Sequence, residues 1–162
     1  MMVKALIEHL EKEIVVYRNL VEVQQAETEN LTSKDYRGLY ETIGRKEHLL
    51  LKVSSMGKDR ARLMESIAGE FEGKDIVNIS GILEQIGGPE HDRLKECQSA
   101  VLTLVDTIKE INKVNALFVE GSIENIKKTL GLLGNFMPKS VYKPTGDFYS
   151  STLKGANLSE GA

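Results

Sequence analysis

The sequence predicts an all-α fold: an elongated antiparallel bundle, or coiled coil, of three long helices and one short helix with a flexible C-terminal tail. Over long stretches, apolar residues recur in alternating steps of three and four, the spacing of one face of a helix. Aromatic residues make up only 6% of the chain and Trp is absent, which suits helix seams of Leu and Ile better than a sheet core. The length of 162 residues fits one modest domain.

The first helix is expected over residues 3–31 because a heptad seam runs through that stretch almost without interruption. A helix of about 29 residues is about 43 Å long at 1.5 Å per residue, which implies an elongated bundle. The seam residues are Val3, Ile7, Leu10, Ile14, Tyr17, Val21, Gln24, Thr28 and Leu31.

The second helix is expected over residues 34–71, with Thr32 or Ser33 as its N-cap. So short a connection makes the first two helices an antiparallel hairpin. Its seam is assigned to Tyr36, Leu39, Ile43, Lys46, Leu50, Val53, Gly57, Arg60, Met64, Ile67 and Phe71. Two interpretations of Lys46, Gly57 and Arg60 stay open: long side chains that extend past the seam, or a hairpin whose middle is loosely packed or kinked.

A short helix is expected over residues 78–86, capped by Asn78 or Ser80, and a third long helix over residues 89–136. Gly87-Gly88-Pro89 separates them, since Pro is well placed in the first turn of a helix. The helical bundle is therefore assigned to residues 1–137. Residues 138–162, rich in Ser and Gly and with two of the three prolines, are assigned to a mobile tail.

Composition excludes several classes of function. The net charge of −3, without a basic patch, gives no case for binding nucleic acid. No window of about 18 uncharged apolar residues is present, so no membrane insertion is expected. The single cysteine, Cys97, excludes an intramolecular disulfide framework, and Lys4 and Glu8 interrupt the apolar N-terminus, so no signal peptide is expected. A cytoplasmic location follows as the expectation.

No set of residues resembles a catalytic or metal site. The three histidines, His9, His48 and His91, lie in separate segments, and none follows a carboxylate at the spacing of di-iron bundles. Zinc-ligand spacing and a Gly-rich phosphate loop are also absent from the sequence. We therefore expect no enzyme activity, no catalytic residue, no metal and no cofactor.

The last long helix combines an apolar stripe with residues that weaken it. Asn112 and Asn115 share one face, and Asn115 occupies a seam position, where a buried Asn fixes register and partner choice. The alternative is an ordinary polar residue on a partly exposed helix. Gly121, Gly131 and Gly134 each cost about 1 kcal/mol relative to Ala in a helix interior. Such a marginal amphipathic helix is suited to gaining order on a partner.

These residues carry a resemblance to the FlgN family of flagellar type III export chaperones. The C-terminal elements are Asn112-x-x-Asn115-x-x-Phe118-Val119-x-x-Ser122-Ile123-x-x-Ile126 and, in the tail, Tyr142-x-x-x-Gly146. The N-terminal elements are Leu31-x-x-x-Asp35-x-x-x-Leu39 and Lys46-Glu47-x-Leu49-Leu50. Phe118 and Val119 replace the Leu-Ile that is common in the family, and the tail extends well past Gly146.

The resemblance implies a non-enzymatic cytoplasmic chaperone that binds the C-terminal helices of hook–filament junction proteins, prevents their premature assembly and delivers them to the membrane export gate. The client-binding residues it implies are Asn115, Phe118, Val119, Ser122, Ile123, Ile126, Leu130 and Leu133. Tyr142 and Gly146 are the candidates for docking through the tail. The free chain is expected to be a monomer or a weak homodimer. The alternative is a structural coiled-coil or adaptor protein whose C-terminal stripe closes a homodimer.

Overall fold

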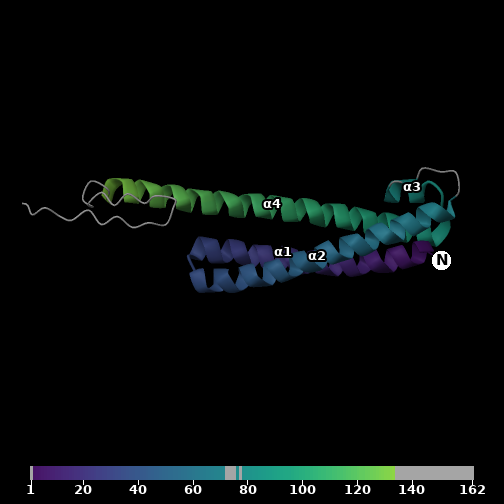
Figure 1. Ribbon diagram of the computed structural model, residues 1–162, viewed down its shortest axis with the longest axis horizontal. Helices are drawn as coiled ribbons and strands as arrows, with labels where there is room; N and C mark the ends of the chain where they lie inside the picture. The colour runs from purple at the N-terminus through teal and green to yellow at the C-terminus, as the bar shows by residue number, and fades with distance from the viewer. Residues whose placement is uncertain (1, 72–75, 77, 134–162) are drawn as a thin grey trace, which may run out of the picture. The chain divides into compact units, whose positions relative to one another are not determined.

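The computed structural model describes residues 2–71, 76 and 78–133, which form four helices (Figure 1). The helices are α1 (Met2–Ser33), α2 (Tyr36–Glu70), α3 (Ile79–Leu83) and α4 (Gly88–Leu133). Strands are absent from these described residues, so the predicted all-α class with three long helices and one short helix is confirmed. The short helix covers less of the chain than the predicted 78–86. Residues 134–136 of the third long helix lie outside the described residues, as does the predicted tail.

The chain divides into two compact units, residues 1–119 and 120–162, with the division inside α4. The first unit contains α1, α2, α3 and the longer part of α4. In the second unit, the structure describes residues 120–133, the continuation of α4. The predicted boundary at residue 137 lies outside the described residues.

The turn between α1 and α2 is built by Asp35 rather than by the two hydroxyl residues before it. Lys34 takes a left-handed conformation (φ 59°), and the Asp35 carboxylate caps α2 by accepting a hydrogen bond of 3.0 Å from the Gly38 amide. A Cβ at Gly38 would collide with that carboxylate. The expectation that Thr32 or Ser33 caps the second helix is wrong, because both residues belong to α1. Asn78, one of the two candidates for α3, does cap that helix.

The apolar core occupies one end of the first unit. It joins the first half of α1, the end of α2, the segment around α3 and the start of α4, and Leu6, Leu10, Ile67, Ile82 and Leu94 are all fully buried. Partly buried residues such as Leu104 pack around this cluster. The core therefore lies at the start of the heptad seam that the sequence predicts for α1.

Ion pairs set the register of the α1–α2 hairpin. Arg60 pairs with Glu13, whose side chain is only 2% exposed, and Lys46 pairs with Glu27 at 2.8 Å. The residue numbers in both pairs sum to 73, as an antiparallel register requires. His9 adds to the first pair, because its Nε2 lies 3.0 Å from Glu13 Oε1 and 2.9 Å from the Met56 carbonyl oxygen. Lys46 and Arg60 thus interrupt the apolar seam because each has an acidic partner on α1.

The face of α2 that contacts α1 differs from the predicted seam. Thr42 is buried and accepts a hydrogen bond of 2.8 Å from the Asn30 side chain, and Lys46 and Arg60 continue the same face toward the core. Tyr36, Ile43 and Leu50 were assigned to the seam, but all three are exposed. In this part of α2 two stripes have helical spacing, and periodicity alone does not tell which of them packs.

Candidate functional site

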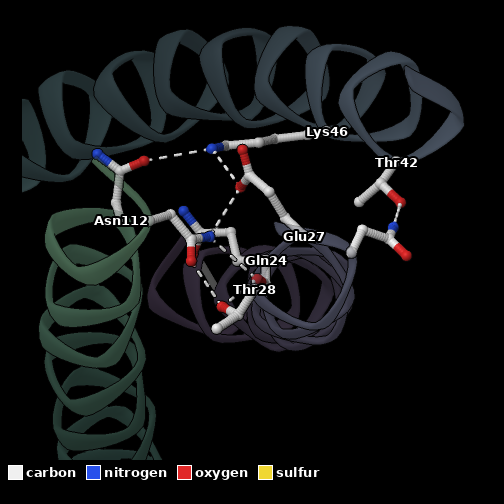
Figure 2. A network of polar contacts seen from close by, with 8 residues as sticks. Gln24, Glu27, Thr28, Thr42, Lys46 and Asn112 are labelled. Atoms are coloured by element: carbon white, nitrogen blue, oxygen red, sulfur yellow. Dashed lines mark hydrogen bonds and ion pairs between the residues drawn. The ribbon is translucent and has the colours of Figure 1, made fainter. Parts of the chain in front are cut away.

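At the end of α1 away from the core, α4 meets the hairpin through a polar network rather than an apolar seam (Figure 2). Asn115 of α4 is only 3% exposed. Its amide nitrogen donates to the Gln24 carbonyl oxygen at 3.2 Å and to Glu27 Oε2 at 3.0 Å, and its Oδ1 accepts a 2.6 Å hydrogen bond from the Thr28 hydroxyl. One α4 side chain therefore binds three consecutive positions on the inner face of α1.

Lys46 extends the network to α2. Its ammonium group donates to Glu27 Oε2 at 2.8 Å and to Asn112 Oδ1 at 3.2 Å, and Figure 2 shows it between these two oxygens. The carboxylate of Glu27 thus accepts from both α2 and α4. We call Gln24, Glu27, Thr28, Lys46, Asn112 and Asn115 the polar network. Because its bonds depend on side-chain geometry, it specifies one register of α4 against the hairpin, as buried polar groups do in coiled coils.

The network places Asn112 and Asn115 in different surroundings. Asn115 is bound to α1, whereas Asn112 is exposed and bonded to Lys46. The prediction that Asn115 is a buried seam residue agrees with this burial. Its predicted role in client binding is untested, and in this structure α1 occupies its side chain. Sequence reasoning missed the role of Thr28, although a polar residue in an otherwise apolar α1 seam was the signal. Gln24 takes part through its backbone carbonyl oxygen, so its side-chain type carried no such signal.

Beyond Asn115, α4 carries exposed apolar residues. Phe118 and Val119 in the first unit are 42% and 43% exposed, and Ile123 and Ile126 in the second are 47% and 58% exposed. With the exposed Ser122, these residues recur along the sequence in steps of three and four, the spacing of one helix face. We call these five residues the α4 stripe. The side chains of Leu130 and Leu133, and the whole of Tyr142 and Gly146, lie outside what the structure describes.

The same segment of α4 also contains an ion pair and two glycines, which affect the stability of the helix in opposite directions. Glu124 and Lys128 form an i,i+4 ion pair at 3.8 Å, which adds modest support to the helix. A Cβ at Gly121 or Gly131 would meet nothing within 4 Å, so packing does not require glycine at either position. Each glycine nevertheless lowers helix stability by about 1 kcal/mol relative to Ala. The apolar stripe therefore lies on a helix with little intrinsic stability.

Cys97 and Arg93, which lie outside the polar network, have shifted pKa values. Burial raises the pKa of the Cys97 thiol, which keeps it protonated near neutral pH and a poor nucleophile. The hydrogen bond and charge of Glu11 raise the pKa of Arg93, and this exposed pair links α1 to α4. Among the described residues, His, Cys, Asp and Glu form no group of three or more that suits a metal ion. None of the described helices is long and apolar enough to cross a membrane.

Comparison with models of known protein families identifies the family of this chain. A family model described as FlgN protein matches residues 1–148, which is most of the chain. The chain belongs to the FlgN family. No curated protein and no solved structure matched the chain.

Membership of the FlgN family makes the chain a flagellar export chaperone in general terms. The predicted resemblance is therefore confirmed over the bundle and into the segment that contains Tyr142 and Gly146. A helical chaperone binds other proteins through its surface, so exposed apolar residues of this FlgN-family chain are candidates for such contacts. The α4 stripe is one such surface.

Proposed function

We propose that the chain binds the C-terminal amphipathic helices of hook–filament junction proteins in the cytoplasm, prevents their premature assembly and delivers them to the flagellar export gate. The observation that supports this proposal is the α4 stripe, where large apolar side chains at helical spacing stay exposed. An amphipathic client helix buries its own apolar face against such a surface. Leu130 and Leu133 extend the same spacing and belong to the proposed site.

The low intrinsic stability of this segment fits a chaperone that must release its client. Gly121 and Gly131 reduce the helix propensity of the segment that carries the stripe. Ordering a marginal helix on binding costs free energy, and that cost lowers the net affinity. The result is a client complex tight enough to hold an aggregation-prone helix and weak enough to give it up at the gate.

A binding assay with purified components tests the proposal. Fluorescence anisotropy would measure the affinity of the full chain for a labelled C-terminal segment of a junction protein. We expect the Ile123→Asp/Ile126→Asp variant to weaken binding at least tenfold, because two charges enter the apolar contact. Leu102→Asp is the matched control, since Leu102 is an exposed leucine of α4 (59%) outside the stripe. Unchanged affinity in the doubly substituted, folded chain would show that the client binds elsewhere.

We propose that delivery depends on the tail, which contains the two candidate docking residues. Tyr142 and Gly146 are the proposed docking residues for the export gate. We expect Tyr142→Ala to leave client affinity unchanged and to reduce secretion of the junction proteins by cells. Loss of client affinity in this variant would assign Tyr142 to client binding instead.

A further inference from the structure

The first half of α2 carries a second exposed surface, which is separate from the α4 stripe. Its members are spaced by three or four residues, as one face of a helix requires. None of them makes the contacts with α1 that Thr42, Lys46, Met56 and Arg60 make. We call this face the outer stripe, and it consists of Tyr36, Tyr40, Ile43, Gly44, Glu47 and Leu51. Gly44 stands at the edge of this face, where it also borders a hollow lined by Asn19, Glu22 and Val23 of α1.

The outer stripe exposes more apolar side-chain area than is usual for a surface in contact with solvent alone. Tyr36 is 73% exposed, Tyr40 82%, Leu51 73% and Ile43 39%. With about 150–250 Å² for each aromatic side chain, the stripe exposes about 500 Å² of side-chain area. This is near the upper end of the largest apolar patch on an ordinary monomer, and it is more than half of the about 800 Å² that each partner buries in a stable complex.

The stripe is complementary to itself when two copies of α2 run antiparallel. With the two-fold axis between Ile43 and Gly44, Tyr36 of one copy meets Leu51 of the other, and Ile43 meets Gly44. The same register brings the Tyr40 hydroxyl of one copy to the Glu47 carboxylate of the other. A two-fold axis repeats each contact, as isologous interfaces require. Parallel pairing instead places Glu47 beside Glu47, and like charges oppose it.

Gly44 is the residue that the isolated chain does not explain. A Cβ there would meet nothing within 4 Å, and glycine is a poor helix former, so neither packing nor propensity accounts for it. A helix crossing does account for it, because the absence of a side chain lets a second helix approach closely. We propose that the outer stripe is a homodimer interface in which two copies of this chain cross antiparallel at Gly44.

Sedimentation equilibrium of the full chain tests this interface with a substitution that favours the helix. Gly44→Gln adds helix propensity and meets open space in the single chain, so the variant is expected to fold. We expect wild type to show a monomer–dimer equilibrium and Gly44→Gln to raise the dissociation constant at least tenfold. Gly69→Gln is the matched control, because Gly69 is an exposed residue of the same helix with equally open surroundings outside the outer stripe. This control is expected to dimerise like wild type.

Cross-linking provides the second measurement. Gly44→Cys is expected to form a disulfide-linked dimer under mild oxidation, while Gly69→Cys is not, and Cys97 is buried in both variants. A wild-type chain that stays monomeric up to its solubility limit would overturn the proposal. So would a dimer that Gly44→Gln leaves intact, because its interface would lie elsewhere. A chain carrying Tyr40→Ser and Leu51→Ser that dimerises like wild type but binds the client more weakly would assign the stripe to the client and also overturn the proposal.

Discussion

Replacing Asn115 by Leu tests whether the polar network stabilises the first unit. Asn115 makes two hydrogen bonds to neutral partners and one to the Glu27 carboxylate. At about 1 kcal/mol for each neutral bond and about 2 kcal/mol for the charged one, the loss is about 4 kcal/mol. Burying the leucine returns about 2 kcal/mol. The expected net effect of Asn115→Leu is a destabilisation of about 2 kcal/mol.

The partners of Asn115 explain why the expected loss is no larger. The Thr28 hydroxyl has one proton for both Asn115 Oδ1 and the Gln24 carbonyl oxygen, and without Asn115 it donates that proton to the carbonyl oxygen, which lies 3.0 Å away. Glu27 keeps its ion pair with Lys46. No partner is therefore left buried without any hydrogen bond, which is the most costly outcome of such a substitution. Asn115→Ala adds no apolar area comparable to that of leucine, so it is expected to destabilise by about 4 kcal/mol.

Urea unfolding followed by circular dichroism measures these differences. Asn112→Leu is the matched control, because Asn112 lies one turn away at an exposed site, where its side chain accepts a 3.2 Å hydrogen bond from Lys46. We expect this control to change the free energy of unfolding by less than about 0.5 kcal/mol. An Asn115→Leu chain as stable as wild type would refute the stabilisation assigned to the Asn115 hydrogen bonds. The network would then specify register without adding net stability, as in some buried ionic clusters.

Three further predictions follow from individual side chains. Arg60→Met should lower the free energy of unfolding in urea by about 3 kcal/mol, since Glu13 stays buried without its guanidinium partner. Arg62→Met, which removes an exposed ion pair, is the control and should lower it by less than about 1 kcal/mol. Gln24→Met should raise the free energy of unfolding by about 1 kcal/mol, because the buried Gln24 Oε1 has no hydrogen-bond partner among the described residues. A lower melting temperature of the variant in calorimetry would contradict this prediction. Cys97 should react with iodoacetamide far more slowly at pH 8 in the folded chain than in urea, since burial raises its pKa and blocks access, and equal rates would show that the thiol is accessible.

Helical periodicity predicted the helices well, but burial follows the predicted seam of α1 without interruption only as far as Ile14. Val3, Ile7, Leu10 and Ile14 lie on the predicted seam, and all four are buried. Beyond Ile14, Val16, Leu20 and Val23 are buried, and the predicted Tyr17 and Val21 are half-buried. In α2 the same method failed for Tyr36, because apolar residues there form two stripes and only the contacts with α1 distinguish them. A pattern of apolar residues shows that a helix has a face to bury, but not which neighbour covers it.

The charged positions of the hairpin show a second limit of sequence reasoning. Arg60 interrupts the α2 stripe, and only its partner Glu13, forty-seven residues away, explains it. The signal was present as a matched spacing, since Glu13 and Glu27 are as far apart as Lys46 and Arg60. Using that signal requires the antiparallel register to be known, and the register in turn depends on how the turn at Asp35 is built. Charge partners across a hairpin are therefore assigned only once the turn is fixed.

The two ends of the first unit are held by different forces, and this difference bears on function. Near Leu6 and Leu94 the helices share an apolar core, whose contribution depends little on side-chain geometry. Near Asn115 the contact consists of hydrogen bonds and an ion pair, which hold only in one register. If leucine or isoleucine replaced these polar residues, apolar seams could slide, and the register of α4 would no longer be fixed. A chaperone with exposed apolar residues such as Ile126 needs that protection, because its own helices would compete for the surface that we propose binds the client.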